Sequence, residues 1–314
     1  MPYPIENKLV IAVSSRALFD LEAANAIHEA QGVKAYRCHQ IERLDQPLAK
    51  GVAFPFVRRL LRLNELYPQE QPVEVVVLSR NSPETGQRFF RSCRHYGLAI
   101  TRGAFLSGQS PYDFLSAYNA SLFLSANRDD VIAATQGGLP AGWVLPTRAD
   151  DDTNDHELRI AFDFDGVIAD DESERVYAHG QLEAFHAHEL ARAGAPHSPG
   201  PLQELFSKIG RFQQLEAQRA SEQPGYRAAL RISIVTARSA PAEERLVTTL
   251  KNWGMSAAEL FLMGGIEKKR VLEVLRPHIF FDDQLGHLEP SSATVPSVLV
   301  PFGVKNENTS GQDQ

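Results

Sequence analysis

The residues with the clearest chemical potential lie where an apolar run ends in two acids. Residues 158–162 (LRIAF) precede Asp163, Phe164, Asp165 and Gly166. In parallel α/β sheets ligands bind at the carboxyl ends of strands, so a strand here would hold both carboxylates against a substrate. Asp163 can attack a phosphorus atom and form an aspartyl-phosphate. Asp165 can protonate the leaving oxygen and then activate water, while Gly166 permits a sharp turn.

Two further segments carry groups that suit a phosphate ester. The apolar run 232–235 leads to Thr236 and Ala237, where a strand-end hydroxyl can hydrogen-bond a phosphoryl oxygen. We therefore predict that Thr236, Ala237 and Gly166 bind the substrate. Lys268 stands at the start of a predicted helix and can neutralise the charge that builds on the phosphoryl group. Lys269 and Arg270 are alternatives for that role.

A second pair of acids indicates a metal ion. Asp282 and Asp283 follow the apolar residues 279–281, and adjacent carboxylates repel each other unless a cation lies beside them. Mg²⁺ is the expected cation because it prefers oxygen ligands and bridges phosphate to carboxylate. The predicted ligands are Asp163, Asp165, Asp282 and Asp283, and the sequence does not decide which of the last two binds the ion.

Each of these elements alone also fits an ordinary structural role. The acids could lie in solvated turns, Thr236 could cap a helix, and Lys268 could face solvent. The ordered set of strand and DxD, strand and Thr, Lys at a helix start, and strand and DD is far more specific. It resembles the haloacid dehalogenase superfamily of phosphohydrolases.

A closer resemblance extends over nearly the whole chain. Residues 12–19, 171–175, 235–239 and 276–284 are similar to the cytosolic type I 5′-nucleotidases. The resemblance implies hydrolysis of AMP-like nucleoside 5′-monophosphates with Mg²⁺. It also implies that Asp163 is the nucleophile, Asp165 the acid and base, and Lys268 the neutralising lysine, with Asp282 or Asp283 on the metal.

One departure from that family limits the substrate prediction. Relatives read D-G-D-A-V where this chain reads DFDGV at 163–167. Both acids are retained, so the chemistry should be too, but fine substrate preference transfers less well. The alternatives are a phosphatase for other small phosphate esters and a nucleotide-binding regulatory protein.

The elements that must position these residues alternate along the chain. Apolar runs of strand length are separated by helical patterns such as 241–253 and 268–275, which predicts doubly wound parallel sheets of the α/β class. The expected strands are Leu9–Val13, Val73–Leu78, Leu122–Leu124, Leu158–Phe162, Ile232–Val235 and Ile279–Phe281.

The two halves of the chain align with each other. Residues 12 and 35–40 match 161 and 184–189 at an offset of 149, and residues 77–79 and 122–125 match 234–236 and 279–282 at an offset of 157. This predicts two Rossmann-like lobes from a tandem duplication, although any two such lobes share some likeness. In the alignment Ser14, Arg16 and Ser125 replace Asp163, Asp165 and Asp282.

This alignment predicts the domain layout. Residues 1–150 should form a catalytically silent lobe, with a phosphate-binding regulatory site at Ser14, Ser15, Arg16 and Ser79 as an alternative. Residues 157–304 should form the catalytic haloacid dehalogenase-like domain, with a helical cap at about 170–227. We expect the acidic stretch 149–157 to be a linker and 305–314 to be a disordered tail.

Composition and net charge indicate which partners and which cellular location to expect. The formal charge of −7 disfavours nucleic-acid polymers and anionic membranes as partners. Two cysteines, Cys38 and Cys93, cannot build a disulfide framework, which favours a reduced cytoplasmic location. No apolar run approaches the 18 residues of a membrane span. A nucleoside monophosphate is the expected partner, and a homo-oligomer is left open.

Overall fold

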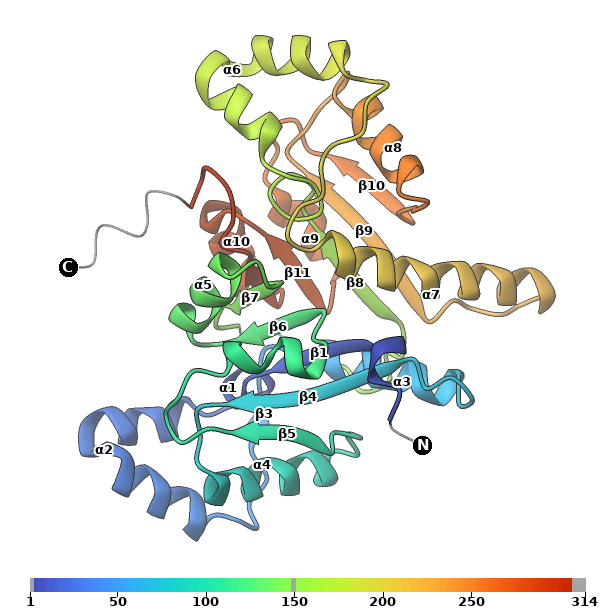
Figure 1. The fold of residues 1–314 in the computed structure, drawn as a ribbon. Helices are drawn as coiled ribbons and strands as arrows, with labels where there is room; N and C mark the ends of the chain where they lie inside the picture. The colour runs from blue at the N-terminus through green and yellow to red at the C-terminus, as the bar shows by residue number, and fades with distance from the viewer. Residues whose placement is uncertain (1–2, 148–150, 307–314) are drawn as a thin grey trace. The chain divides into compact units, whose positions relative to one another are not determined.

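The computed structural model describes residues 3–147 and 151–306. The chain divides into two compact units, with the boundary between Val144 and Leu145 (Figure 1). This boundary falls before the predicted end of the first lobe at residue 150. Each unit is a parallel sheet with helices, as the α/β prediction requires.

The first unit contains a five-stranded parallel sheet in the order β7-β6-β1-β4-β5. Every residue of β1 and β4 is buried, which is why β1 is apolar throughout and β4 is apolar except at Glu74 and Ser79. The strands are β1 (Leu9–Val13), β4 (Val73–Ser79), β5 (Arg102–Phe105), β6 (Leu122–Ser125) and β7 (Ala141–Val144), and a separate pair is β2 (Phe19–Asp20) and β3 (Ala49–Lys50). The helices are α1 (Ser15–Leu18), α2 (Glu22–Glu42), α3 (Phe54–Leu66), α4 (Pro83–His95) and α5 (Arg128–Gln136), with short 3-10 turns at Ile5–Asn7, Tyr112–Phe114 and Ser116–Tyr118.

The second unit contains a five-stranded parallel sheet in the order β10-β9-β8-β11-β12. Counted along each unit, this is the same strand order as in the first. The strands are β8 (Leu158–Phe162), β9 (Leu230–Thr236), β10 (Glu259–Leu262), β11 (Ile279–Asp282) and β12 (Ser297–Leu299). The helices are α6 (Glu172–Ala191), α7 (Gln203–Glu222), α8 (Glu243–Asn252), α9 (Lys268–Leu275) and α10 (Leu285–Ser292).

All six predicted strands are present, and the two predicted helices are α8 and α9. Sequence analysis missed β5, β7, β10 and β12. These strands lie at or near the outer positions of the two strand orders and are only three or four residues long. Their short runs, such as RGAF in β5, are too brief and too mixed to stand out from loops.

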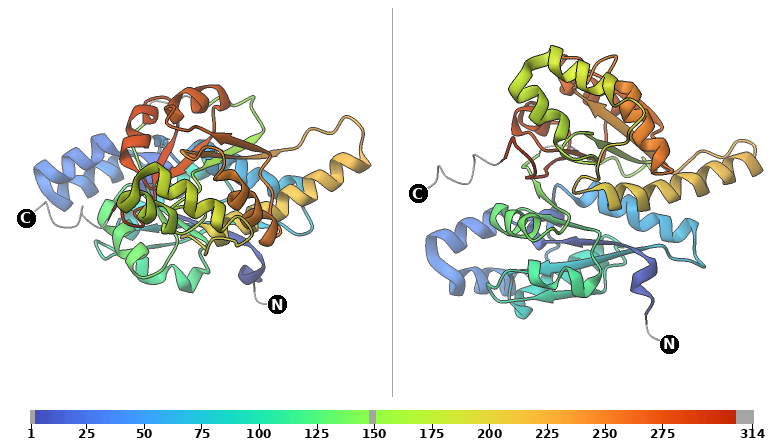
Figure 2. Two further views of the ribbon diagram at one scale, coloured as in Figure 1. Left: turned by 90° about the horizontal axis from the view of Figure 1, so that it is seen from above. Right: turned by 45° about the horizontal axis from the view of Figure 1, so that its top comes forward.

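The predicted cap region at about 170–227 contains two helices with different roles. Figures 1 and 2 show α6 bent in its middle and α7 long and straight. The ring of Phe206 in α7 packs 5.3 Å from that of Phe162 in β8, so α7 covers the sheet. Only α6 lies over the strand ends, because its residues Glu174 and Phe185 line the cavity there.

Two segments predicted to be unstructured are partly ordered. In the acidic stretch, Asp155 Oδ2 lies 2.6 Å from Nη2 of Arg159 and Glu157 Oε2 lies 3.1 Å from Nη1, so ion pairs hold it to β8. Residues 148–150 lie outside the described residues. At the other end, Asn306 Nδ2 donates to the backbone oxygen of Asp283 at 2.9 Å, which ties the start of the predicted tail to the site. Residues 307–314 of that tail lie outside the described residues.

Candidate active site

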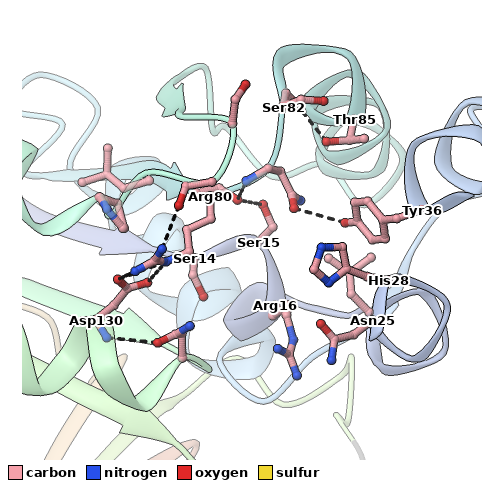
Figure 3. A pocket seen from close by; sticks show the side chains of 18 of the residues that line it. Ser14, Ser15, Arg16, Asn25, His28, Tyr36, Arg80, Ser82, Thr85 and Asp130 are labelled. Atoms are coloured by element: carbon pink, nitrogen blue, oxygen red, sulfur yellow. Dashed lines mark hydrogen bonds and ion pairs between the residues drawn. The ribbon is translucent and has the colours of Figure 1, made fainter. Parts of the chain in front are cut away.

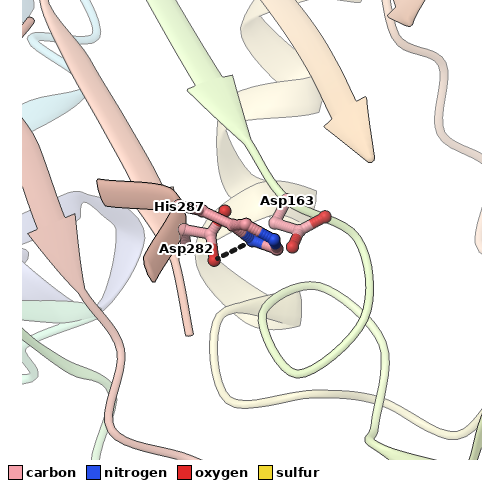
Figure 4. A group of neighbouring side chains, drawn as sticks. All are labelled: Asp163, Asp282 and His287. Carbon is pink, nitrogen blue, oxygen red and sulfur yellow. Dashed lines mark hydrogen bonds and ion pairs between the residues drawn. The ribbon is translucent and has the colours of Figure 1, made fainter. Parts of the chain in front are cut away.

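The predicted site residues of the second unit meet at the carboxyl ends of three neighbouring strands. Asp163 follows β8, Thr236 ends β9 and Asp282 ends β11, and the strand order places β8 between the other two. Lys268 begins α9. Figure 4 shows the carboxylates of Asp163 and Asp282 close together, with the ring of His287 beside them.

Lys268 joins the two acids. Its Nζ lies 2.5 Å from Asp163 Oδ2 and 2.7 Å from Asp282 Oδ2, and the lysine is only 3% exposed. Burial alone would lower the pKa of Lys268, but the two carboxylates raise it above its ordinary value, so the ammonium is charged. The alternative Lys269 points elsewhere, because its Nζ lies 3.8 Å from Glu273.

The pKa of Asp163 reflects the same balance. Burial is the largest influence and raises this pKa, the ammonium of Lys268 opposes it, and the carboxylate of Asp282 adds to the rise. The result is a pKa of about 6. Asp163 is therefore ionised at neutral pH, poorly hydrated and held against a fixed positive charge, which suits a nucleophile.

Asp283 and Glu174 form a second acid pair, whose charge Lys305 and Lys268 offset only in part. Asp283 is 1% exposed, and neither its Oδ2 nor Oε2 of Glu174 accepts a hydrogen bond within the described residues. Burial and the neighbouring carboxylates raise the pKa of Asp283 well above its ordinary value, and burial with Asp165 and Asp163 raises that of Glu174 to about 8. Buried carboxylate oxygens without partners fit a hard divalent cation.

Asp282 and Asp283 differ in how free their oxygens are to bind a metal ion. Asp282 already accepts hydrogen bonds from Lys268 Nζ and from the backbone N–H of Gln284 at 2.8 Å. Its Oδ1 also lies 3.3 Å from His287 Nδ1. The side chains of Asp163, Asp282 and His287 are close enough together to surround an ion. Asp283 has an unused oxygen, so it is the better placed ligand of the two.

Gly166 is required by this arrangement. Its φ is +70°, in the left-handed region that other residues rarely adopt. A Cβ placed on it would lie 2.7 Å from Oδ2 of Asp283. The residue predicted to bind substrate therefore also keeps the space beside the free carboxylate oxygen open.

Asp165 has a partner that sequence analysis did not assign. Its Oδ2 accepts from Arg238 Nε at 2.8 Å and its Oδ1 from Nη2 at 2.6 Å. Arg238 also donates to Glu189, and it is 3% exposed. Burial alone would lower the pKa of Arg238, but the carboxylates of Asp165 and Glu189 raise it. The signal available in the sequence was an arginine two residues beyond the end of β9.

Thr236 and Ala237 occupy the turn after β9. Thr236 is 1% exposed, and its Oγ1 accepts a hydrogen bond from the backbone N–H of Arg238 at 3.3 Å. Ala237 is exposed and lines the cavity. The turn therefore presents backbone at the cavity wall, while the hydroxyl stays inside the turn.

A cavity of about 370 Å³ opens beside these groups. Asp165 and Arg238 line it together with Tyr177 and Phe185 of α6, and the guanidinium carbon of Arg238 lies 5.5 Å from the centroid of the Phe185 ring. The two rings meet edge to face, with centroids 6.4 Å apart. A phosphate ester with a ring-bearing organic group would find both charged groups and aromatic surface in this lining.

Fold and site define this protein as an α/β protein with a carboxylate-rich site at the strand ends. The chain belongs to the 5′-nucleotidase family, whose model matches residues 1–307. Human cytosolic 5′-nucleotidase 1B is 33% identical to it over 296 residues, which is 92% of this chain and 48% of that protein. The chain thus spans about half the length of this curated relative. No solved structure matches it.

Proposed function

We propose that this chain hydrolyses AMP-like nucleoside 5′-monophosphates to nucleoside and phosphate. The observation that carries the proposal is Lys268 joining Asp163 to Asp282, beside a cavity with an aromatic wall. Membership of the 5′-nucleotidase family and the name of the human relative support the substrate class. The four strand-end elements support a core of the haloacid dehalogenase kind.

In the proposed mechanism Asp163 and Asp165 carry out the bond formation and the proton transfers of both chemical steps. A carboxylate oxygen of Asp163 forms a bond to phosphorus as the bond to the 5′ oxygen breaks, and Asp165 gives that oxygen a proton. Asp165 then takes a proton from water as the water oxygen attacks phosphorus and frees Asp163 and phosphate. Each oxygen of Asp165 accepts one hydrogen bond from Arg238, which leaves a second lone pair on that oxygen for the transferred proton.

The donor set fits Mg²⁺. Asp163 and Asp283 would hold the ion, with Asp165 and Asp282 beside it. When bound, Mg²⁺ would offset the charge on the phosphoryl oxygens. Lys268, whose Nζ contacts Asp163 and Asp282, supplies a second positive charge and would remain in place throughout both steps.

The two units support the tandem duplication. Shifting β1 by 149 residues gives the bounds of β8, and shifting β4, β5 and β6 by 157 gives those of β9, β10 and β11. In the first unit Ser14, Arg16 and Ser125 occupy the positions of the catalytic acids. We infer that the first unit is catalytically silent and that the second carries the reaction.

The test is phosphate release from AMP with Mg²⁺. Asp163→Asn should lower kcat by at least about 10³-fold, whereas Asp113→Asn, an exposed acid of the first unit, should leave it unchanged. If the enzyme hydrolysed sugar phosphates much faster than AMP, the proposed substrate class would be wrong. A wild-type protein inactive toward every ester would favour the regulatory alternative.

Two further properties belong to this proposal. Cys38 and Cys93 are both free thiols, which is consistent with a reduced cytoplasmic location, and the human relative is named as cytosolic. Every helix in the described part of the chain is too short or too polar to cross a lipid bilayer.

A further inference from the structure

The first unit contains a cavity of about 380 Å³ at the carboxyl ends of its own strands (Figure 3). Ser14, Ser79 and Ser125 line it just beyond or at the ends of β1, β4 and β6. Ser15 and Ser79 are joined by a hydrogen bond of 2.9 Å between their hydroxyls. Within the first unit, this cavity has the position that the candidate active site has within the second unit.

The two cavities correspond residue by residue under the same offsets of 149 and 157. Arg16, Asn25, His28 and Tyr36 take the places of Asp165, Glu174, Tyr177 and Phe185, and all eight line their cavities. The aromatic residues also share their geometry. The rings of His28 and Tyr36 meet edge to face, with centroids 5.9 Å apart and planes at 84°, and those of Tyr177 and Phe185 meet at 6.4 Å and 83°.

The residues that line the two cavities differ in charge. The first cavity has three arginines, Arg16, Arg37 and Arg80, and one acid, Asp130, among its lining residues. Arg80 is paired with Asp130, its Nε lying 2.9 Å from Oδ2. Nη2 of Arg16 lies 2.7 Å from Oε1 of the exposed Glu22, whereas its Nε is buried and has no hydrogen-bond partner in the described residues. The two acids of the second cavity's lining, Asp165 and Glu174, are thus replaced by the guanidinium group of Arg16 and the amide of Asn25.

We propose that the first cavity is a second, non-catalytic binding site for a nucleoside phosphate. Its serines and arginines can bind a phosphate group directly, because guanidinium and hydroxyl donors need no metal to hold an anion. The His28–Tyr36 wall would pack against the organic ring. With Ser14 in place of a nucleophilic aspartate, the ligand would be held and not cleaved. The choice of AMP as probe rests on the proposed function.

The test measures AMP binding to full-length Asp163→Asn protein by equilibrium dialysis. With Mg²⁺ we expect two AMP molecules per chain, because Asp283 and the amide oxygen introduced at position 163 can still ligate the ion. With EDTA we expect one, because the first cavity needs no metal while the second depends on it. Adding Arg16→Gln should weaken the EDTA-resistant site by at least about tenfold. The matched control Arg94→Gln, an exposed arginine of α4 outside the cavity lining, should leave it unchanged.

Thermal unfolding of each variant checks that it is folded. No AMP bound in EDTA, or unchanged affinity in the Arg16→Gln variant, would overturn the second site. Inorganic phosphate binding as tightly as AMP would show that the aromatic wall makes no contact and would overturn the nucleotide class. Phosphate release by the wild-type enzyme is a separate readout, so this inference and the proposed function can fail independently.

Discussion

At the residue scale, the candidate site carries more negative charge than its own cations offset. Lys268 joins Asp163 to Asp282, and Arg238 pairs with Asp165 and Glu189. Asp283 and Glu174 are offset only in part by Lys268 and Lys305, because burial and the neighbouring carboxylates outweigh these cations and raise both pKa values. A buried excess of carboxylates costs stability unless a cation or protons compensate it.

This imbalance predicts opposite effects of one substitution with and without metal. Asp283→Asn removes a repelled carboxylate, so in EDTA the variant should be about 1 kcal/mol more stable than wild type. Mg²⁺ at 100 times its Kd should stabilise wild type by about 2.7 kcal/mol and the variant by far less. Urea unfolding with EDTA and with Mg²⁺ measures both differences.

Asp282→Asn is the matched comparison. It removes a counterion of buried Lys268, so it should destabilise the protein under both conditions by about 3–5 kcal/mol while leaving a stabilising response to Mg²⁺. If this variant lost the Mg²⁺ response and Asp283→Asn kept it, our assignment of the metal ligand would be reversed.

At the element scale, the bend of α6 builds the cavity wall. In a straight helix Tyr177 and Phe185 would be about 12 Å apart along the axis. The bend at Gln181, with φ 61° and ψ −167°, brings their rings to 6.4 Å. The equivalent residue of α2 is Gly32, with φ 81° and ψ 178°. This region of backbone space is open almost only to glycine.

Gln181 is therefore predicted to be strained, and Gln181→Gly should stabilise the protein. Relief of about 1–3 kcal/mol exceeds the entropy cost of a new glycine, about 0.4–1 kcal/mol. The net gain of about 1 kcal/mol should raise Tm by about 2–4 °C. Differential scanning calorimetry measures it.

The reverse exchange serves as the control for the bend. No atom lies within 4 Å of a Cβ built on Gly32, so Gly32→Gln adds backbone strain without a clash and should lower Tm. A lower Tm for Gln181→Gly would mean that the glutamine side chain contributes more than its backbone conformation costs.

The elements show what the sequence could predict. The bounds of β1 and β8 could be predicted, because parallel strands covered on both faces are apolar along nearly their whole length, with Arg159 as the one polar residue in β8. The short strands β5 and β10 lack that signal. Asp163, Asp282 and Lys268 could be predicted to meet because strand ends share one edge. The partners Arg238 and Glu174 could not, since their contacts depend on side-chain geometry across distant segments.

At the scale of the whole molecule, a buried ionic network links α6, the loop before α7 and the turn after β9. Glu189 accepts from Ser173 Oγ at 2.8 Å and from Arg245 Nη1 at 3.0 Å, and it also accepts from Arg238. His197 Nε2 lies 3.3 Å from Oε2 of the same carboxylate. The burial of these groups makes the free energy of unfolding of the chain depend on their protonation.

The pKa of His197 determines whether the free energy of unfolding rises or falls with pH. Burial lowers its pKa, but Asp170 and Glu189 outweigh burial and raise it above 6.5, although Arg238 opposes them. Below pH 6.5 the histidine is protonated in both folded and unfolded chains, and its ion pairs stabilise the fold fully. As pH rises from 6.5 through the folded pKa, that stabilisation is lost.

The variant His197→Asn should therefore lose more stability at acidic than at alkaline pH. We expect a loss of about 1–3 kcal/mol near pH 6 and a smaller loss at pH 9, measured by urea unfolding at both values. His156→Asn, at an exposed histidine, should change neither. An equal loss for His197→Asn at both pH values would mean that His197 stabilises the network as a neutral hydrogen-bonding group, so the charge on its ring would have no part in holding the cavity wall to the strand ends.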